Sequence, residues 1–255
     1  MPCAEGRVNA PLAMRCAQAV MAKAPQPGRS KTRLAPLMGP EQAAMLSAAF
    51  LRDITENIRA AAAESPIDGY IAYAPAGLEH LFDGHLASGT GFVLADGRID
   101  VPPDVQGFGR CLLHAVGALL AAGYGAACVV NSDSPTLPTE YLQRAADLLT
   151  APGERAVLGP ADDGGYYLLG VKSAHTHLFA DIAWSTEAVA AQTLQRAKEI
   201  GLPVHVLPSW YDVDDAASLR RLLGTLQGHN GTPAPFAAPA TVACVARLGL
   251  AADAG

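Results

Sequence analysis

Residues 17–34 read Ala-Gln-Ala-Val-Met-Ala-Lys-Ala-Pro-Gln-Pro-Gly-Arg-Ser-Lys-Thr-Arg-Leu, an apolar run that passes into a turn rich in proline and glycine. The apolar run, residues 17–22, is typical of a buried strand. The prolines and the glycine of residues 25–28 prevent a helix or a paired strand from continuing, and helical spacing resumes only around Glu41. The sequence therefore predicts a strand with a loop at its carboxyl end.

This loop carries four cations within eleven positions: Lys23, Arg29, Lys31 and Arg33. In open α/β sheets ligands bind at the carboxyl edge, and backbone N–H groups beside Lys and Arg form sites for di- or triphosphates. A basic loop that is merely solvated is the alternative, because most cationic side chains are exposed. This stretch alone does not distinguish a phosphate-binding loop from a solvated one.

Strand-like and helix-like segments alternate along the rest of the chain. Strands are expected at 70–73, 126–130, 156–158, 166–171 and 204–207, and helices at 43–63, 111–122, 140–149, 186–200 and 216–226. Such alternation predicts an α/β fold with a mostly parallel central sheet and helices on both faces. Residues 228–240 are rich in Gly, Pro and Ala, which indicates an irregular tail that ends in a short helix at 240–248.

Composition excludes several functional classes. The 255 residues are 50% hydrophobic and 16% charged, which suffices for a sizeable core, and a net charge of −6 argues against nucleic-acid binding. No apolar run approaches the length of a membrane span and no leader is evident, so we expect a cytoplasmic protein. Five cysteines without a Cys-x-x-Cys pair favour reduced, structural thiols.

Asp133 lies in Asn131-Ser-Asp-Ser-Pro135, directly after the apolar run 126–130. It is therefore expected at the carboxyl end of a strand, on the same edge as the basic loop. A carboxylate there could hold Mg²⁺ against phosphate oxygens. Alternatively, the motif is ordinary turn chemistry, or Asp133 caps the helix that follows Pro138.

A second acidic motif, Tyr211-Asp-Val-Asp-Asp215, precedes the helix expected at 216–226. Capping of that helix by Asp214 or Asp215 is the simple explanation. Three carboxylates in four residues exceed what a cap needs, however, and two Asp residues meeting at one edge would suffice for Mg²⁺.

The third motif is Gly159-Pro-Ala-Asp-Asp-Gly-Gly-Tyr-Tyr167. Paired glycines beside Asp favour a tight hairpin. They could also let a ligand approach the backbone, with a tyrosine ring on which to stack.

Five motifs together resemble a bacterial family described as glycosyltransferase-like (DUF2064 type), itself similar to the phospholactate guanylyltransferases of deazaflavin-cofactor synthesis. They are Ala22-Lys-Ala-Pro-Gln-Pro-Gly-Arg-Ser-Lys-Thr-Arg-Leu34, Asn131-Ser-Asp-Ser-Pro-Thr-Leu-Pro138, Gly159-Pro-Ala-Asp-Asp-Gly-Gly-Tyr-Tyr-Leu-Leu-Gly170, Ile182-Ala-Trp-Ser-Thr186 and Tyr211-Asp-Val-Asp214. The resemblance covers about residues 17–225. It implies a Rossmann-like GT-A fold, that of the nucleotide-diphospho-sugar transferases, with an N-terminal extension at 1–16, one nucleotidyltransferase-like domain at 17–227 and a Pro/Ala-rich tail at 228–255.

Site residues follow from the resemblance position by position. It implies Lys31, Arg33 and Asp133 as catalytic residues, and Asp133 and Asp214 as ligands of Mg²⁺ or Mn²⁺. The nucleotide or substrate would contact Lys23, Pro27, Gly28, Lys31, Thr32, Arg33, Asp163, Gly164, Gly165, Trp184, Ser185 and Thr186. Ser185 or Thr186 could instead only cap the next helix. The segment Gln106 to Arg110 lies where relatives tend to have a longer and more acidic one.

The leading interpretation is transfer of a nucleoside monophosphate from a triphosphate to a small phosphorylated or phosphonate acceptor, with release of pyrophosphate. Glycosyl transfer from a nucleotide sugar is the alternative within enzymes, and a nucleotide-binding protein without catalysis is the alternative outside them. The expected partners are the nucleotide and a small-molecule acceptor, without nucleic acid or membrane, and a homodimer is compatible with the Leu- and Ala-rich composition. His175 and His177 are expected to be exposed or packing residues.

Overall fold

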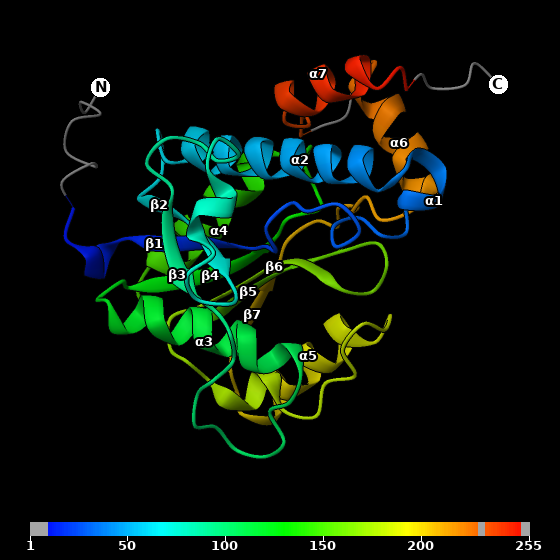
Figure 1. The fold of residues 1–255 in the computed structure, drawn as a ribbon. Coiled ribbons are helices and arrows are strands. Elements are labelled where there is room, and N and C mark those ends of the chain that lie inside the picture. The colour runs from blue at the N-terminus through cyan, green and yellow to red at the C-terminus, as the bar shows by residue number, and fades with distance from the viewer. Residues whose placement is uncertain (1–9, 229–232, 251–255) are drawn as a thin grey trace, which may run out of the picture.

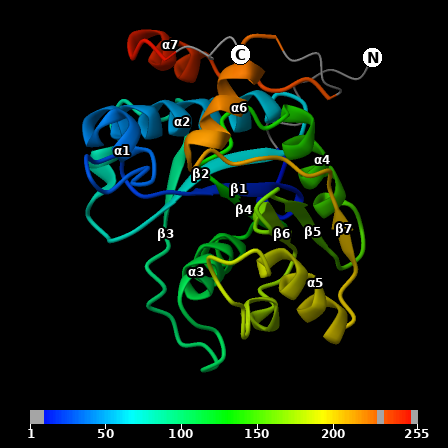
Figure 2. The ribbon, with the colours of Figure 1, turned by 90° about the vertical axis from the view of Figure 1, so that its right-hand side faces the viewer.

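A computed structural model describes residues 10–228 and 233–250 of the chain. A central seven-stranded sheet has the order β3-β2-β1-β4-β6-β5-β7 (Figures 1 and 2). The strands are β1 (Cys16–Met21), β2 (Ile67–Tyr73), β3 (Gly91–Leu94), β4 (Ala126–Asn131), β5 (Ala156–Pro160), β6 (Tyr166–Val171) and β7 (Val204–Val206). Only β6 runs antiparallel to its neighbours. The predicted α/β fold with a mostly parallel sheet is confirmed.

Helices cover both faces of this sheet. They are α1 (Ala35–Met38), α2 (Pro40–Ala61), α3 (Phe108–Ala121), α4 (Thr139–Thr150), α5 (Val189–Glu199), α6 (Ala216–Leu226) and α7 (Pro239–Arg247). In Figure 1, α2 and α7 lie above the sheet and α3 and α5 below it. One core lies between the sheet and helices α2 and α4, and a second between the sheet and helices α3 and α5.

The register of the central strands determines where the loops emerge. Met21, the last residue of β1, pairs with Ala72 of β2 and with Asn131 of β4. The carboxyl ends of three parallel strands are therefore level. Their loops share one edge of the sheet, which is where a parallel α/β sheet binds its ligands.

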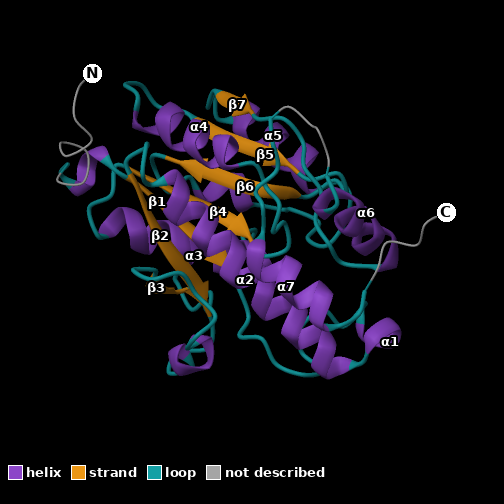
Figure 3. Ribbon diagram, turned by 90° about the horizontal axis from the view of Figure 1, so that it is seen from above, coloured by secondary structure: helices purple, strands orange, loops and turns teal. Residues whose placement is uncertain are grey.

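The C-terminal segment packs against α2. Figure 3 shows α7 lying along α2, and the buried Asp53 of α2 accepts hydrogen bonds from the backbone N–H groups of Ala240 and Thr241 at 2.9 and 2.6 Å. These are N–H groups of the first turn of α7, which have no partner within a helix. Parts of the expected N-terminal extension and C-terminal tail, residues 1–9, 229–232 and 251–255, lie outside the described residues.

The structure corrects three of the sequence expectations. Helix α5 begins at Val189 rather than at 186, and neither Ser185 nor Thr186 caps it, because its N-cap position is Ala188. Helix α3 begins at Phe108, earlier than expected. Strand β3 was not predicted. Each helix in the described part of the chain is too short or too polar to span a bilayer.

Candidate active site

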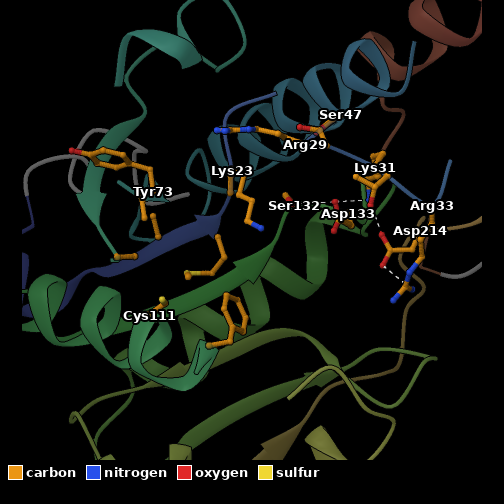
Figure 4. Close-up of a pocket in the computed structure, with 18 residues that line it drawn as sticks. Lys23, Arg29, Lys31, Arg33, Ser47, Tyr73, Cys111, Ser132, Asp133 and Asp214 are labelled. Atoms are coloured by element: carbon orange, nitrogen blue, oxygen red, sulfur yellow. Dashed lines mark hydrogen bonds and ion pairs between the residues drawn. The ribbon is translucent and has the colours of Figure 1, made fainter. Parts of the chain in front are cut away.

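A cavity of about 450 Å³ opens at the carboxyl edge of the sheet (Figure 4). The polar residues of its lining are Lys23, Arg29, Ser30, Lys31, Thr32, Arg33, Ser47, Ser132, Asp133 and Asp214. The mostly apolar residues of its lining are Met21, Ala22, Ala72, Tyr73, Ala74, Ala95, Phe108 and Cys111. The cavity therefore offers cations to a polyanion and apolar side chains to a flat group.

The basic loop is an ordered turn. The backbone N–H groups of Arg29 and Ser30 both donate to the carbonyl of Gln26 at 3.1 Å, and the Ser30 hydroxyl accepts from the Gln26 N–H at 3.0 Å. Leu34 is fully buried and anchors the far end. Lys31 has a φ of +48°, in the left-handed region that non-glycine residues rarely adopt. A strained backbone at a ligand cavity is characteristic of functional loops.

The Lys31 ammonium lies between the two carboxylates that the sequence suggested as metal ligands (Figure 4). Its Nζ is 2.6 Å from Asp133 Oδ1 and 2.9 Å from Asp214 Oδ1. Burial disfavours the charged ammonium, but the two carboxylates outweigh burial and raise the pKa of Lys31 above its ordinary value. Lys31, although it lines the cavity, is therefore charged and already paired in this structure.

Asp133 and Asp214, far apart in the sequence, are brought together by hydrogen bonds between their segments. The Val213 N–H donates to the Asp133 carbonyl at 2.9 Å, and the Ser134 hydroxyl donates to the Tyr211 carbonyl at 2.9 Å. The two acidic motifs thus form one unit beside the basic loop. Asp133 does not cap α4, whose N-cap position is Pro138.

The remaining cations of the loop are exposed. The Arg33 side chain is 75% exposed and reaches Asp214 only at 3.9 Å. Lys23 and Arg29 form no ion pair within the described part of the chain and both line the cavity. These three side chains are available to phosphate oxygens, whereas the Lys31 ammonium is already engaged.

The two carboxylates fit a divalent cation. Asp133 and Asp214 each direct one oxygen at the same nitrogen, so they converge on one cation position. In residues 10–228 and 233–250 no group of three or more His, Cys, Asp or Glu side chains could enclose a metal ion. Mg²⁺ is commonly held by one or two carboxylates and completed by water and phosphate oxygens, which matches this pair.

Asp212 adds negative charge near the pair. Burial, together with the charges of Asp163, Asp214 and Asp133, raises its pKa to about 6. The acidic side of the site thus extends beyond the two carboxylates that contact Lys31.

No sequence motif indicated the aromatic and thiol side chains of the cavity lining. Tyr73 is the last residue of β2 and Phe108 the first of α3, so both lie at the ligand-binding edge. Cys111 follows on the next turn of α3, and burial raises the pKa of its thiol. An aromatic residue at the end of a predicted strand was the one available signal, since these uncharged side chains carry no motif.

Several residues that the resemblance placed at the nucleotide do not line this cavity: Pro27, Gly28, Asp163, Gly164, Gly165, Trp184, Ser185 and Thr186. The predicted tight hairpin at Gly164 and Gly165 is present and joins β5 to β6. Gly164 has a φ of +89°, and a Cβ there would lie 2.1 Å from the Glu187 carbonyl oxygen. Gly164 thus lets another segment of the chain's own backbone approach closely.

Trp184 packs against the segment Gln106 to Arg110. A Cβ on Gly109 would lie 2.8 Å from the Trp184 ring, which also contacts Phe108 edge to face at 5.8 Å. Arg110 donates to the carbonyls of Gly97 and Ile99. Two motifs without an assigned role therefore hold one another and fix the Phe108 ring that forms part of the cavity wall.

A second cavity of about 190 Å³ adjoins the first, and both are lined by Met21, Phe108, Ser132 and Asp133. Leu112, Val129, Val130, Asn131 and Tyr166 complete its lining. The Asn131 Oδ1 and the Tyr166 hydroxyl are buried and have no hydrogen-bond partner among the described residues. Asp133 thus stands where a large and a small compartment meet.

Two solved structures with the same fold are named as transferases. A protein from Desulfovibrio desulfuricans G20, provisionally named a nucleotide-diphospho-sugar transferase, is 28% identical, with a TM-score of 0.74 over 92% of this chain and 96% of that one. A cytidylyltransferase from Leptospira borgpetersenii serovar Hardjo-bovis (strain JB197) is 10% identical, with a TM-score of 0.51 over 92% and 94% of the two chains, and shares the fold.

No curated protein matches the chain. A model of the family described as "Uncharacterized protein conserved in bacteria (DUF2064)" matches residues 57–186, which is just over half of the sequence. The motifs on which the resemblance rested extend on both sides of that match. The chain belongs to the DUF2064 family.

Proposed function

We propose that the protein is a Mg²⁺-dependent nucleotidylyltransferase that transfers a nucleoside monophosphate from a triphosphate to a small phosphorylated or phosphonate acceptor and releases pyrophosphate. One observation carries the proposal: a cavity lined by cations and aromatic rings, and two carboxylates converging on one cation position. A nucleoside triphosphate has matching parts, namely an anionic chain, a flat base and phosphate oxygens that ligate Mg²⁺.

The charged and aromatic residues of the lining give the nucleotide an orientation. Its phosphates would lie against Lys23, Arg29 and Arg33, and its base against Tyr73 and Phe108. A base stacked on aromatic rings and a triphosphate beside Lys and Arg are both favourable contacts. The α-phosphorus, between base and terminal phosphates, would then lie near Asp133.

The chemistry is an in-line displacement at that phosphorus. An acceptor phosphate or phosphonate oxygen forms a bond to the α-phosphorus, and the bond from the α-phosphorus to the α,β-bridging oxygen breaks with its electron pair leaving on pyrophosphate. The exposed cations stabilise the charge on the leaving pyrophosphate. When bound, the metal ion supplies Lewis-acid stabilisation of the phosphoryl oxygens. Positioning and charge do most of the catalytic work in such reactions, so no side-chain nucleophile is needed.

The smaller cavity gives the acceptor a place. It meets the nucleotide cavity at Ser132 and Asp133, and its walls at Leu112, Val129 and Val130 are apolar. An acceptor with a compact apolar body could enter it and direct its phosphate or phosphonate group at the α-phosphorus. The two unpartnered atoms, of Asn131 and Tyr166, would offer hydrogen bonds to its far end.

Glycosyl transfer from a nucleotide sugar is the second candidate, and the provisional name of the D. desulfuricans protein favours it. The same cavity would then hold a nucleoside diphosphate esterified to a sugar. Pyrophosphate carries more charge than such a diphosphate and gains more from three exposed cations, which is why we prefer the triphosphate. A nucleotide-binding protein without catalysis is the third candidate.

A thermal-shift screen tests the proposal. The purified protein is heated with each of the four nucleoside triphosphates, their diphosphates and common nucleotide sugars, each with Mg²⁺ and with EDTA. A ligand that binds only the native state at a hundredfold excess over its Kd stabilises it by about 2.7 kcal/mol. We expect a Mg²⁺-dependent rise in Tm with one triphosphate. A rise with a nucleotide sugar only would favour glycosyl transfer, and no rise with any ligand would contradict both.

A further inference from the structure

The Lys31 ammonium is surrounded by oxygens of the protein itself. Besides its contacts of 2.6 Å to Asp133 and 2.9 Å to Asp214, Nζ donates to the Val213 carbonyl at 2.7 Å. Nζ thus has three protein oxygens within 2.9 Å, as many as an ammonium has N–H donors. The side chain is only 4% exposed and lies over the Phe50 ring, with Nζ 5.3 Å from the ring centroid.

This position coincides with the one where a divalent cation would bind. Asp133 and Asp214 are the two carboxylates that converge on a single point, and Lys31 Nζ is at that point. An ammonium and a divalent cation repel one another and would share the same two oxygens as partners. Both cannot be bound there together.

We propose that Lys31 is the resident cation of this carboxylate pair, and that a divalent metal ion binds only by displacing the Lys31 ammonium. The second half of the inference rests on the proposed function: the displaced ammonium moves to the phosphate oxygens of the nucleotide. Lysine suits such a role because its charge is a point at the end of a flexible four-carbon stem. The left-handed backbone of Lys31 directs that stem from the basic loop to the carboxylates.

Displacement couples metal binding to nucleotide binding. A metal ion that enters alone leaves a buried ammonium without its partners, which is unfavourable. A metal ion that enters with a triphosphate supplies new acceptors for that ammonium. Metal affinity is therefore low without the nucleotide and high with it, and by linkage the nucleotide gains the same factor from the metal.

Direct metal binding tests the first half without nucleotide. Free Mn²⁺ is measured by electron paramagnetic resonance during titration of the wild type, Lys31→Met, Arg33→Met and the double variant Lys31→Met/Asp133→Asn. We expect Lys31→Met to bind one Mn²⁺ at least tenfold more tightly than the wild type. Nucleotide binding, in contrast, would be weakened by the loss of a cation that contacts phosphates. Arg33→Met, a matched loss of one charge from the same loop, should show no such gain, and the double variant should lose it.

Equal Mn²⁺ affinity of the wild type and Lys31→Met would overturn the inference, as would a gain that persists without the Asp133 carboxylate. Chemical acetylation of the wild type keeps the inference testable if Lys31→Met does not fold. Mass spectrometry of peptides should show Lys31 unreactive in metal-free protein and reactive after saturation with Mn²⁺, while the exposed Lys198 reacts equally in both states. Unchanged protection of Lys31 at saturating Mn²⁺ would contradict displacement.

The two proposals fail separately. If Lys31→Met gains Mn²⁺ affinity but no nucleotide affects Mn²⁺ binding to the wild type, the resident cation stands and the nucleotidylyltransferase proposal falls. If a triphosphate binds with Mn²⁺ but Lys31→Met shows no gain, the enzyme proposal stands and the resident cation falls.

Discussion

Single charged residues at the sheet edge have different environments although they come from one loop. Lys31 is buried between two carboxylates, and Arg33 is largely exposed at the cavity wall. Lys31 and Arg33 are only two positions apart, but in this structure only the exposed Arg33 side chain is free to contact a phosphate group. The cationic character of the cavity rests on Lys23, Arg29 and Arg33.

Replacement of Arg33 by alanine should weaken triphosphate binding. The change removes one charge-assisted contact to phosphate, and we expect a loss of roughly tenfold in affinity, about 1.4 kcal/mol. Isothermal titration with the triphosphate selected by the thermal-shift screen measures it. Lys198→Ala removes an exposed charge of α5 outside this cavity and should leave the affinity unchanged. Equal affinity of Arg33→Ala and the wild type would remove Arg33 from the phosphate site.

Residue types in the sequence indicated the charged half of the cavity but not its arrangement. Lys23, Lys31, Thr32, Arg33, Asp133 and Asp214 do lie together. The direction of the Lys31 side chain depends on a left-handed φ, and this conformation cannot be predicted from a lysine in the sequence. Tyr73, Phe108 and Cys111 were missed because apolar residues at strand and helix ends look like ordinary core.

At the scale of elements, the start of helix α6 shows which Asp of the second acidic motif caps the helix and which faces the site. Asp215 caps the helix: its Oδ1 accepts from the Ser218 N–H at 2.8 Å, and the Ser218 hydroxyl accepts from the Asp215 N–H at 3.0 Å. Asp214 instead faces Lys31. The cap therefore fixes the backbone that positions Asp214.

Asp215→Ala should destabilise the protein by about 1 kcal/mol at pH 7, while Asp215→Asn should lose much less because Asn also caps. Hydrogen bonds from Ser218 lower the pKa of Asp215. The stabilisation is accordingly present above the ordinary Asp pKa of about 3.9 and is lost as the pH falls through the lowered folded value. Urea unfolding from pH 7 down to pH 3 should show the difference between Asp215→Ala and the wild type shrinking. A difference independent of pH would contradict a cap by the carboxylate.

Gly164→Ala tests the hairpin between β5 and β6. A Cβ would meet the Glu187 backbone in a left-handed conformation, so the hairpin or the loop before α5 must shift. We expect a loss of roughly 1–3 kcal/mol in the free energy of unfolding. Gly201→Ala is a matched control, since Gly201 also has a positive φ of +65° but no atom near its Cβ position. Similar losses for both variants would show that backbone strain alone accounts for the effect.

Some helix boundaries were predictable from the apolar pattern, but not where glycines interrupt it. The helices at 140–149 and 216–226 lie within a residue of α4 and α6. Helix α3 begins inside a Gly-Phe-Gly stretch that reads as a break, because glycine is a poor helix former. Glycine is nevertheless favoured at position 109, because the Trp184 ring packs so closely against Gly109 that a side chain there would collide with it. The four-residue β3 is too short for a periodic pattern.

At the scale of the whole molecule, helices α6 and α7 pack with the segments that carry the site. Leu34 of the basic loop, Phe50 of α2 and Val213 of the acidic motif form one buried cluster with α6 and α7. The carboxylate pair thus depends on packing between segments far apart in the sequence. The family resemblance implied a single domain at 17–227, but it could not indicate these long-range contacts, which depend on three-dimensional packing.

Asp53→Ala should release the start of α7. The change leaves the N–H groups of Ala240 and Thr241 without their acceptor, and we expect a cost of about 2–3 kcal/mol. Asp53→Asn keeps one acceptor oxygen and should cost less. Urea unfolding at constant pH compares the three proteins. An Asp53→Ala variant as stable as the wild type would show that α7 does not need this anchor.

Cleavage between the α- and β-phosphates at Asp133 can be followed by analysis of the reaction products. The triphosphate selected by the thermal-shift screen, labelled at the α-phosphate, is incubated with the protein, Mg²⁺ and a bacterial extract of small phosphorylated molecules. We expect the wild type to yield pyrophosphate and a new compound that carries the label, in equal amounts, and Asp133→Asn to yield neither. An intact triphosphate, with nucleoside diphosphate released from a nucleotide sugar instead, would contradict it.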